Sequence, residues 1–255
     1  MLAGTDLHVA DLGRVRALTQ VIRRNIEREA AEWGVSVRAA WALAVGPVLV
    51  AAFVALTIAY RPLYAALIEE DGIIESVQIG ALVGLAIVGA AIAHRLLTRR
   101  RMVLGSLYFL AAAAAVFIFG EEISWGQRIL GWATPAELAV LNQQGETNIH
   151  NIGHTLRALN LVMMSVAFVA ATLPMVWRLW ARDRAREVDE YLLVPPLFLA
   201  TGFLIAVAYR LVRMALIPEA RYVVSRFQEV TELAFYAGLL VFAFLALRRL
   251  RRDVV

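Results

Sequence analysis

Two histidines and several scattered carboxylates are the side chains of this sequence that are best suited to chemistry. His150 and His154 would share one face if the stretch that carries them is helical. A His-x-x-x-His pair with carboxylates from other segments is a suitable ligand set for Zn²⁺ or Fe²⁺. In this interpretation His150 and His154 are metal ligands, with Glu229, Glu122 or Glu232 completing the set. Hydrogen-bonded structural histidines are the alternative, because such pairs occur often by chance.

Acid–base catalysis and anion binding are the further chemistry that the residue types allow. Glu75, Glu122 and Glu232 are flanked by apolar sequence and are the catalytic candidates, one of them as a general base that activates water. Arginine binds phosphate or carboxylate groups in a bidentate manner. The candidates for substrate binding are Arg210, Arg213, Arg226 and Gln127. Structural ion pairs of Arg210 and Arg213 with glutamates of the last apolar segment are the alternative.

Two short polar segments hold several of these residues. Residues 120–128 read GEEISWGQR, and residues 146–151 read ETNIHN. This pattern resembles one found in uncharacterised bacterial polytopic integral membrane proteins. The resemblance covers only this part of the chain, and it implies a membrane protein without implying an activity.

The composition indicates that most of this chain lies in lipid. The 255 residues are 61% hydrophobic and 18% charged, whereas soluble domains are about 45–50% apolar and about 25% charged. A membrane-spanning helix needs about 20 predominantly apolar residues, and six segments have this length. They are residues 39–60, 73–97, 102–120, 156–177, 191–217 and 227–247. The expected fold is therefore an all-α, polytopic bundle of about six transmembrane helices.

Arginine clusters predict the orientation of this bundle. All 25 basic residues are arginine, and they gather before the first predicted span, after the second and fourth, and after the last. The other three connections are acidic or poor in arginine. The positive-inside rule then places both termini in the cytoplasm, and the chain in the inner membrane of a bacterium. The expected units are a cytoplasmic segment 1–38, a membrane domain 39–247 and a tail 248–255.

Two segments outside the spans have patterns of their own. Residues 9–32 predict an amphipathic helix, which either lies on the membrane surface or packs under the bundle. The connection 121–154 is long enough to be functional. Within it Thr134 and Glu137 form a capping-box pattern that predicts a helix ending near Gly145, the second of two short interfacial helices.

The convergence of acids, histidines and arginines at one side of the membrane favours an enzyme. The expected substrate is a lipid or a lipid-linked, phosphate-bearing molecule at the extracytoplasmic face, with Zn or Fe as a possible cofactor. The alternatives are a proton- or cation-coupled carrier, a non-catalytic assembly protein and, less favoured, a heme protein. The bilayer is the expected partner, and membrane topology explains the arginines without nucleic acid.

Overall fold

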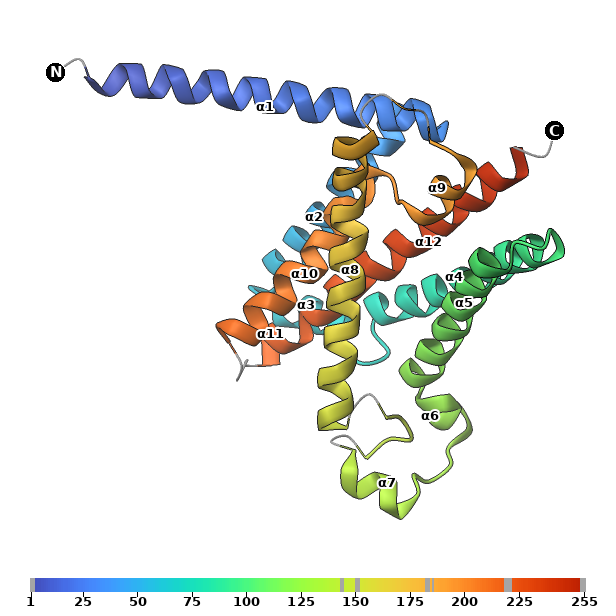
Figure 1. Ribbon diagram of the computed structural model, residues 1–255. Helices are drawn as coiled ribbons and strands as arrows, with labels where there is room; N and C mark the ends of the chain where they lie inside the picture. Colours follow the sequence, from blue (N-terminus) through green and yellow to red (C-terminus); the bar gives the residue numbers. More distant parts are fainter. Residues whose placement is uncertain are drawn as a thin grey trace.

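The protein is a bundle of helices (Figure 1). The computed structural model describes residues 3–142, 145–149, 152–181, 184, 186–217 and 222–252, without the side chains of residues 3–15, 18, 128, 153, 154 and 156. Within these ranges the one extended pairing is an isolated bridge between Asn142 and Ile152. The predicted all-α fold is confirmed.

Six helical segments of the described chain are long and apolar enough to cross a membrane. Their main helices are α2 (Val37–Thr57), α4 (Ile73–Thr98), α5 (Met102–Glu122), α8 (Gly153–Ala181), α10 (Ala200–Ala215) and α12 (Gln228–Arg252). We call the end of the bundle where α5 finishes and α12 begins the loop end, and the opposite end, where helix α1 (Ala3–Trp33) lies, the α1 end. Both ends of each main helix lie within five residues of the ends of a predicted span, except for the start of α10, which is nine residues later.

The fifth predicted span, 191–217, is not one continuous helix. It is divided into α9 (Val188–Leu193), a 3₁₀ turn η2 (Leu197–Leu199) and α10. The break lies at Pro195 and Pro196, because proline has no N–H to donate within a helix and its ring clashes with the preceding turn. Two short helices, α3 (Arg61–Ile68) and α11 (Tyr222–Arg226), precede α4 and α12.

The bundle is held together by close helix pairs. Helices α4 and α5 form a hairpin, α12 packs on α4, and α10 contacts α8, α12 and α2. The rings of Phe203 and Phe235 pack edge to face where α10 meets α12, with centroids 6.1 Å apart. A Cβ added to Gly238 would lie only 2.9 Å from the Phe203 ring, so this contact needs a glycine. Small residues of this kind let membrane helices approach closely.

Helix α1 (Ala3–Trp33) crosses the α1 end and extends beyond the other helices (Figure 1). Its last two turns are part of the core, since Ile26, Ala30 and Trp33 are buried. Val21 and Ile22, one turn earlier, are about half exposed. Of the two predicted positions for this helix, packing under the bundle therefore holds for its C-terminal turns.

The connection between α5 and α8 contains three short helical pieces: η1 (Ser124–Gly126), α6 (Gln127–Leu130) and α7 (Ala136–Leu141). The predicted capping box of Thr134 is wrong. Pro135 is the residue that precedes α7, without any side-chain cap, and the helix ends at Leu141 and not near Gly145. The Thr134 hydroxyl is used elsewhere in the loop, in bonds to Gln127 and to the Gly145 carbonyl.

Candidate functional site

A buried ion pair at the loop end joins α10 to α12. Arg210 Nη2 lies 2.9 Å from Glu232 Oε1, and the two side chains are 3% and 9% exposed. The same carboxylate oxygen accepts a bond of 2.7 Å from Gln228 Nε2, one turn earlier on α12. Removing a charge from water costs several kcal/mol unless a partner compensates it. The two charges therefore depend on each other for their burial.

Helix α4 adds two polar side chains to this region. The fully buried Gln78 donates from Nε2 to the backbone oxygen of Glu229 at 2.5 Å, which ties α4 to the start of α12. Glu75 Oε2 accepts a bond of 2.8 Å from the backbone N–H of Asp71, just before α4. The carboxylates of Glu75 and Glu232 act electrostatically on Glu229. Two of the acids that the sequence singled out, Glu75 and Glu232, are thus near enough to a third, Glu229, to act on it electrostatically.

Tyr236 lies near the same ion pair, since its hydroxyl and Arg210 Nη2 both approach the sulfur of Met163. Its side chain is buried, and the charges of Glu232, Glu122 and Arg210 act on it. Its oxygen lies 4.0 Å from the sulfur of Met163 on α8. The sequence interpretation missed Tyr236, although its spacing of four residues from Glu232 places both on one helix face. We call the following set the Arg210 cluster: Glu75, Gln78, Arg210, Gln228, Glu229, Glu232 and Tyr236.

Two buried atoms of the Arg210 cluster have no hydrogen-bond partner among the described residues. They are Arg210 Nε, a donor, and Gln78 Oε1, an acceptor. An unsatisfied buried polar atom costs about 1–3 kcal/mol. Each such atom in a folded protein therefore requires an explanation, and a bound water or ligand is one.

Other predicted site residues lie outside this cluster. Arg213 bonds the carbonyl of Ile217 at 3.4 Å, near the end of its own helix. Arg226 pairs with Glu70 at 2.7 Å on the exposed turn before α4. Gln127 belongs to the loop, where its amide bonds the Thr134 hydroxyl and the Thr147 backbone N–H.

The predicted metal ligands are only partly described. His150 and the side chain of His154 fall outside the described residues, while Glu229 belongs to the Arg210 cluster. Within the part of the chain that the structure describes, no three His, Asp or Glu side chains form a group that could hold a metal ion.

The two polar segments of the sequence pattern hold each other in the loop. The buried Ser124 donates to Glu146 Oε2 at 2.7 Å, and Asn148 Nδ2 donates to that oxygen at 2.7 Å and to Ser124 Oγ at 3.0 Å. Glu121 Oε1 accepts from Trp125 Nε1, and its other oxygen accepts from the backbone N–H of Ile149. The polar residues of these two segments therefore have a structural role in holding the loop together, which the resemblance did not indicate.

The backbone at this point is held in an uncommon conformation. Ser124 and Trp125 have φ of 47° and 53°, and Gly126 follows with 88°. Left-handed conformations of residues other than glycine cost of order 1–3 kcal/mol each and persist where the surroundings hold them. The bonds to Glu121 and Glu146 supply that support.

Asn148→Asp is expected to loosen the loop. The change removes both donated bonds and sets a second carboxylate beside Glu146, a local loss of about 2–3 kcal/mol. Amide hydrogen exchange over residues 121–149 should accelerate at least tenfold, while exchange in α12 stays unchanged. Glu137→Gln, on the exposed face of α7, is the control and should leave the loop protected. Unchanged exchange in Asn148→Asp would show that these bonds do not hold the loop.

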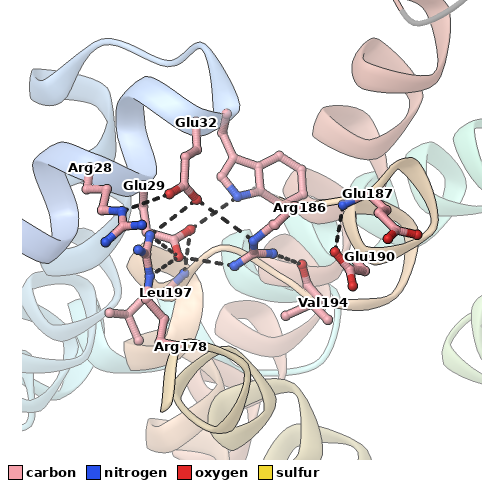
Figure 2. Close-up of polar contacts among 10 residues, drawn as sticks. Arg28, Glu29, Glu32, Arg178, Arg186, Glu187, Glu190, Val194 and Leu197 are labelled. Atoms are coloured by element: carbon pink, nitrogen blue, oxygen red, sulfur yellow. Dashed lines mark hydrogen bonds and ion pairs between the residues drawn. The ribbon is translucent and has the colours of Figure 1, made fainter. Parts of the chain in front are cut away.

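A second buried charge cluster lies at the α1 end (Figure 2). The fully buried carboxylate of Glu29 accepts bonds from side chains of α1, α8 and the segment before α9. The donors are Arg178 Nε at 2.9 Å, Arg186 Nη2 at 3.1 Å, Trp33 Nε1 at 3.1 Å and the backbone N–H of Leu197 at 3.4 Å. We call Glu29, Trp33, Arg178 and Arg186 the Glu29 cluster.

The sequence interpretation missed this cluster. It assigned Arg178 and Arg186 to membrane topology and gave Glu29 no role. The partners are about 150 positions apart in the chain, so no local pattern could pair them.

Comparisons of the chain with protein-family models, curated proteins and solved structures gave no match.

Proposed function

We propose that the protein is a membrane-embedded enzyme that acts on a lipid or lipid-linked, phosphate-bearing substrate at the Arg210 cluster. The observation that carries this proposal is the buried Arg210–Glu232 pair, beside an unpartnered donor and an unpartnered acceptor. Charges inside a membrane protein are costly and usually functional. A purely structural pair would be expected to leave fewer polar atoms unsatisfied around it.

The distribution of arginine supports an extracytoplasmic position for this site. The segments at the α1 end are rich in arginine, whereas the connections at the loop end are acidic or poor in it. By the positive-inside rule the α1 end faces the cytoplasm of a bacterium, and the loop end faces outward. A substrate would then enter the Arg210 cluster from the outer leaflet.

The residues of the cluster suit distinct roles. Arg210 would bind the phosphate through Nε, with Glu232 and Gln228 fixing the guanidinium plane. Glu229 would serve as general base, because its carboxylate is not part of the Arg210 pair and stands among other acids. Gln78 Oε1 would accept a hydroxyl of the substrate, and Glu75 would hold the start of α4.

The metal-dependent form of this proposal needs His150 and His154 together with Glu229. Zinc or iron there would activate a water molecule. Metal content of the purified protein, measured by mass spectrometry beside a His150→Ala/His154→Ala variant, separates the two forms. Near-stoichiometric metal that the variant loses supports the metal-dependent form, and a metal-free active protein contradicts it.

Glu229→Gln is expected to abolish turnover in the following test. The purified chain is placed in nanodiscs of a bacterial polar-lipid extract, and lipids with altered headgroups are identified by mass spectrometry. Loss of a general base lowers rates by about 10²–10⁴-fold. The control Glu69→Gln, on the exposed turn before α4, should retain turnover. No altered lipid with the parent protein would overturn the enzyme proposal, and full turnover in Glu229→Gln would overturn the role of Glu229.

A proton- or cation-coupled carrier is the second candidate. The electrostatic contact among Glu75, Glu229 and Glu232 favours it, since chains of carboxylates relay protons in transporters. It ranks second because the cluster lies near one end of the bundle and not at the midplane, where transporters bind their substrates. Proton flux into vesicles that contain the protein, lost in Glu229→Gln, would favour the carrier.

A further inference from the structure

A cavity at the α1 end lies far from the Arg210 cluster and has no part in the proposed reaction. Its volume is about 530 Å³, and it opens where the turn between α4 and α5, helix α9 and the end of α12 come together. Its lining residues are Arg101, Arg186, Arg249, Glu187, Asp189, Tyr191 and Val188. The three guanidinium groups outnumber the two carboxylates, and this balance favours an anionic occupant.

Arg186 is a buried residue that is held in place by its neighbours, and not a surface side chain. Its side chain is only 1% exposed, and it is fixed by Glu29 and by the carbonyl of Val194, which accepts from Nη1 at 2.8 Å (Figure 2). The faces of Trp33 and Tyr191 lie 5.7 and 5.8 Å from its guanidinium carbon. Its Nε has no hydrogen bond among the described residues and lies 3.9 Å from the Glu32 carboxylate. Arg186 is therefore a fixed, buried positive charge in the wall of the cavity.

The other walls combine positive charge with a carboxylate. Arg249 lies over the ring of Tyr191, with its guanidinium carbon 4.5 Å from the centroid. Arg101 forms an ion pair with Asp189, which joins the α4–α5 turn to α9. The cavity thus offers donors for a phosphate and an acceptor for a hydroxyl.

The surroundings add positive charge at the level of lipid headgroups. Residues 99–101 and 248–252 contribute seven arginines and no acidic residue. Nearby, the guanidinium of Arg184 stacks on Trp177 and Trp180 at 5.0 and 5.4 Å, and tryptophan is typical of the membrane interface. Basic pockets between helices at this level bind anionic lipid headgroups.

We propose that this cavity binds the headgroup of an anionic phospholipid whose phosphate carries a hydroxyl-bearing group, taken from the leaflet at the α1 end. The phosphate contacts Arg249 and Arg101, beside the buried positive charge of Arg186, and Asp189 accepts a headgroup hydroxyl. Zwitterionic lipids fit less well, because their ammonium group would face the arginines.

The test is native mass spectrometry of the full chain, purified in detergent and titrated with phosphatidylglycerol or with phosphatidylcholine of the same acyl chains. Phosphatidylglycerol is expected to bind at least tenfold more tightly. Arg249→Gln should lose this preference, whereas Arg251→Gln should keep it, because Arg251 is exposed on the same helix, outside the cavity. Equal binding of both lipids, or an equal loss of the preference for phosphatidylglycerol in both variants, would show that anionic lipid is attracted to the basic surface in general. Either result would overturn the proposal.

A variant with unchanged net charge tests whether the lining of the cavity, and not the overall charge of the protein, binds the lipid. Arg101→Gln/Asp189→Asn removes one positive and one negative wall residue, so the net charge of the protein stays the same. It should still weaken phosphatidylglycerol binding about tenfold, and it keeps the test decisive if Arg249→Gln does not fold. Unchanged binding in a folded double variant would overturn the proposal.

A final competition experiment distinguishes a lipid ligand from a soluble phosphate compound. Glycerol phosphate, added in millimolar excess, is expected to leave bound phosphatidylglycerol in place, because it lacks the acyl chains that hold the lipid in the bilayer. Full displacement would identify the site as one for soluble phosphate compounds and would overturn the lipid assignment.

Discussion

Glu29→Gln is expected to destabilise the protein by about 3 kcal/mol, because it leaves the buried Arg186 and its neighbour Arg178 with Glu32 as their counter-charge. The carboxylate is fully buried and bonds both Arg178 and Arg186. At about 2–4 °C per kcal/mol for a chain of this size, the melting temperature should fall by roughly 10 °C. Circular dichroism of the protein in detergent measures this fall.

The same variant should release α1 from the bundle. Trp33 bonds Glu29 and packs edge to face on Tyr191, so tryptophan fluorescence should shift to the red before the spans unfold. Glu27→Gln is the matched control, since Glu27 lies two residues earlier, half exposed, and pairs with the exposed Arg23 along the helix surface. It should melt like the parent. A Glu29→Gln protein with parental melting would show that the Glu29 cluster does not hold α1.

Glu232→Leu is expected to give the second large effect, because it leaves Arg210 buried and unpaired. Breaking one side of a buried pair costs about 3–5 kcal/mol, whereas replacing both sides by apolar residues of similar volume is often neutral. The double variant Arg210→Met/Glu232→Leu should therefore recover most of the melting temperature. It should nevertheless give no altered lipid in the nanodisc assay, because the phosphate-binding group is gone.

This pair of results separates a structural role from a functional one. Melting in detergent reports the structural role, and lipid turnover reports the functional role. The control Arg226→Gln/Glu70→Gln removes an exposed ion pair at the same end of the bundle and should leave both measurements near parental values. A stable double variant with full turnover would show that the Arg210–Glu232 pair only stabilises the bundle.

The sequence predicted the spans because their signal is local. Runs of about 20 apolar residues identify helices in lipid irrespective of their neighbours, and α2, α4 and α5 follow the predicted bounds closely. The fifth span differed because two prolines divide a run whose hydropathy is continuous. The capping box of Thr134 was wrong because the hydroxyl has stronger partners across the loop, at Gln127 and Gly145.

Some candidate residues could be recognised for the same reason. Acids and arginines within apolar sequence stand out, and among them Arg210 pairs with Glu232 at the loop end, where Glu75 and Glu229 also lie. Arg213 and the polar Gln127 were named as well, but they bond to their own local partners. Residue type and position in the sequence could not distinguish the residues of the Arg210 cluster from those that lie outside it.

What the sequence by itself determined is therefore the number of apolar spans and the helical class. Each follows from the free energy of placing a segment in lipid or water, which depends on that segment alone. Only the tertiary structure decided which charges pair, from Arg210 with Glu232 to Arg178 with Glu29. A pair forms where helix packing brings two side chains within about 3 Å in a site that excludes water, and Arg178 and Glu29 are 149 residues apart in the chain.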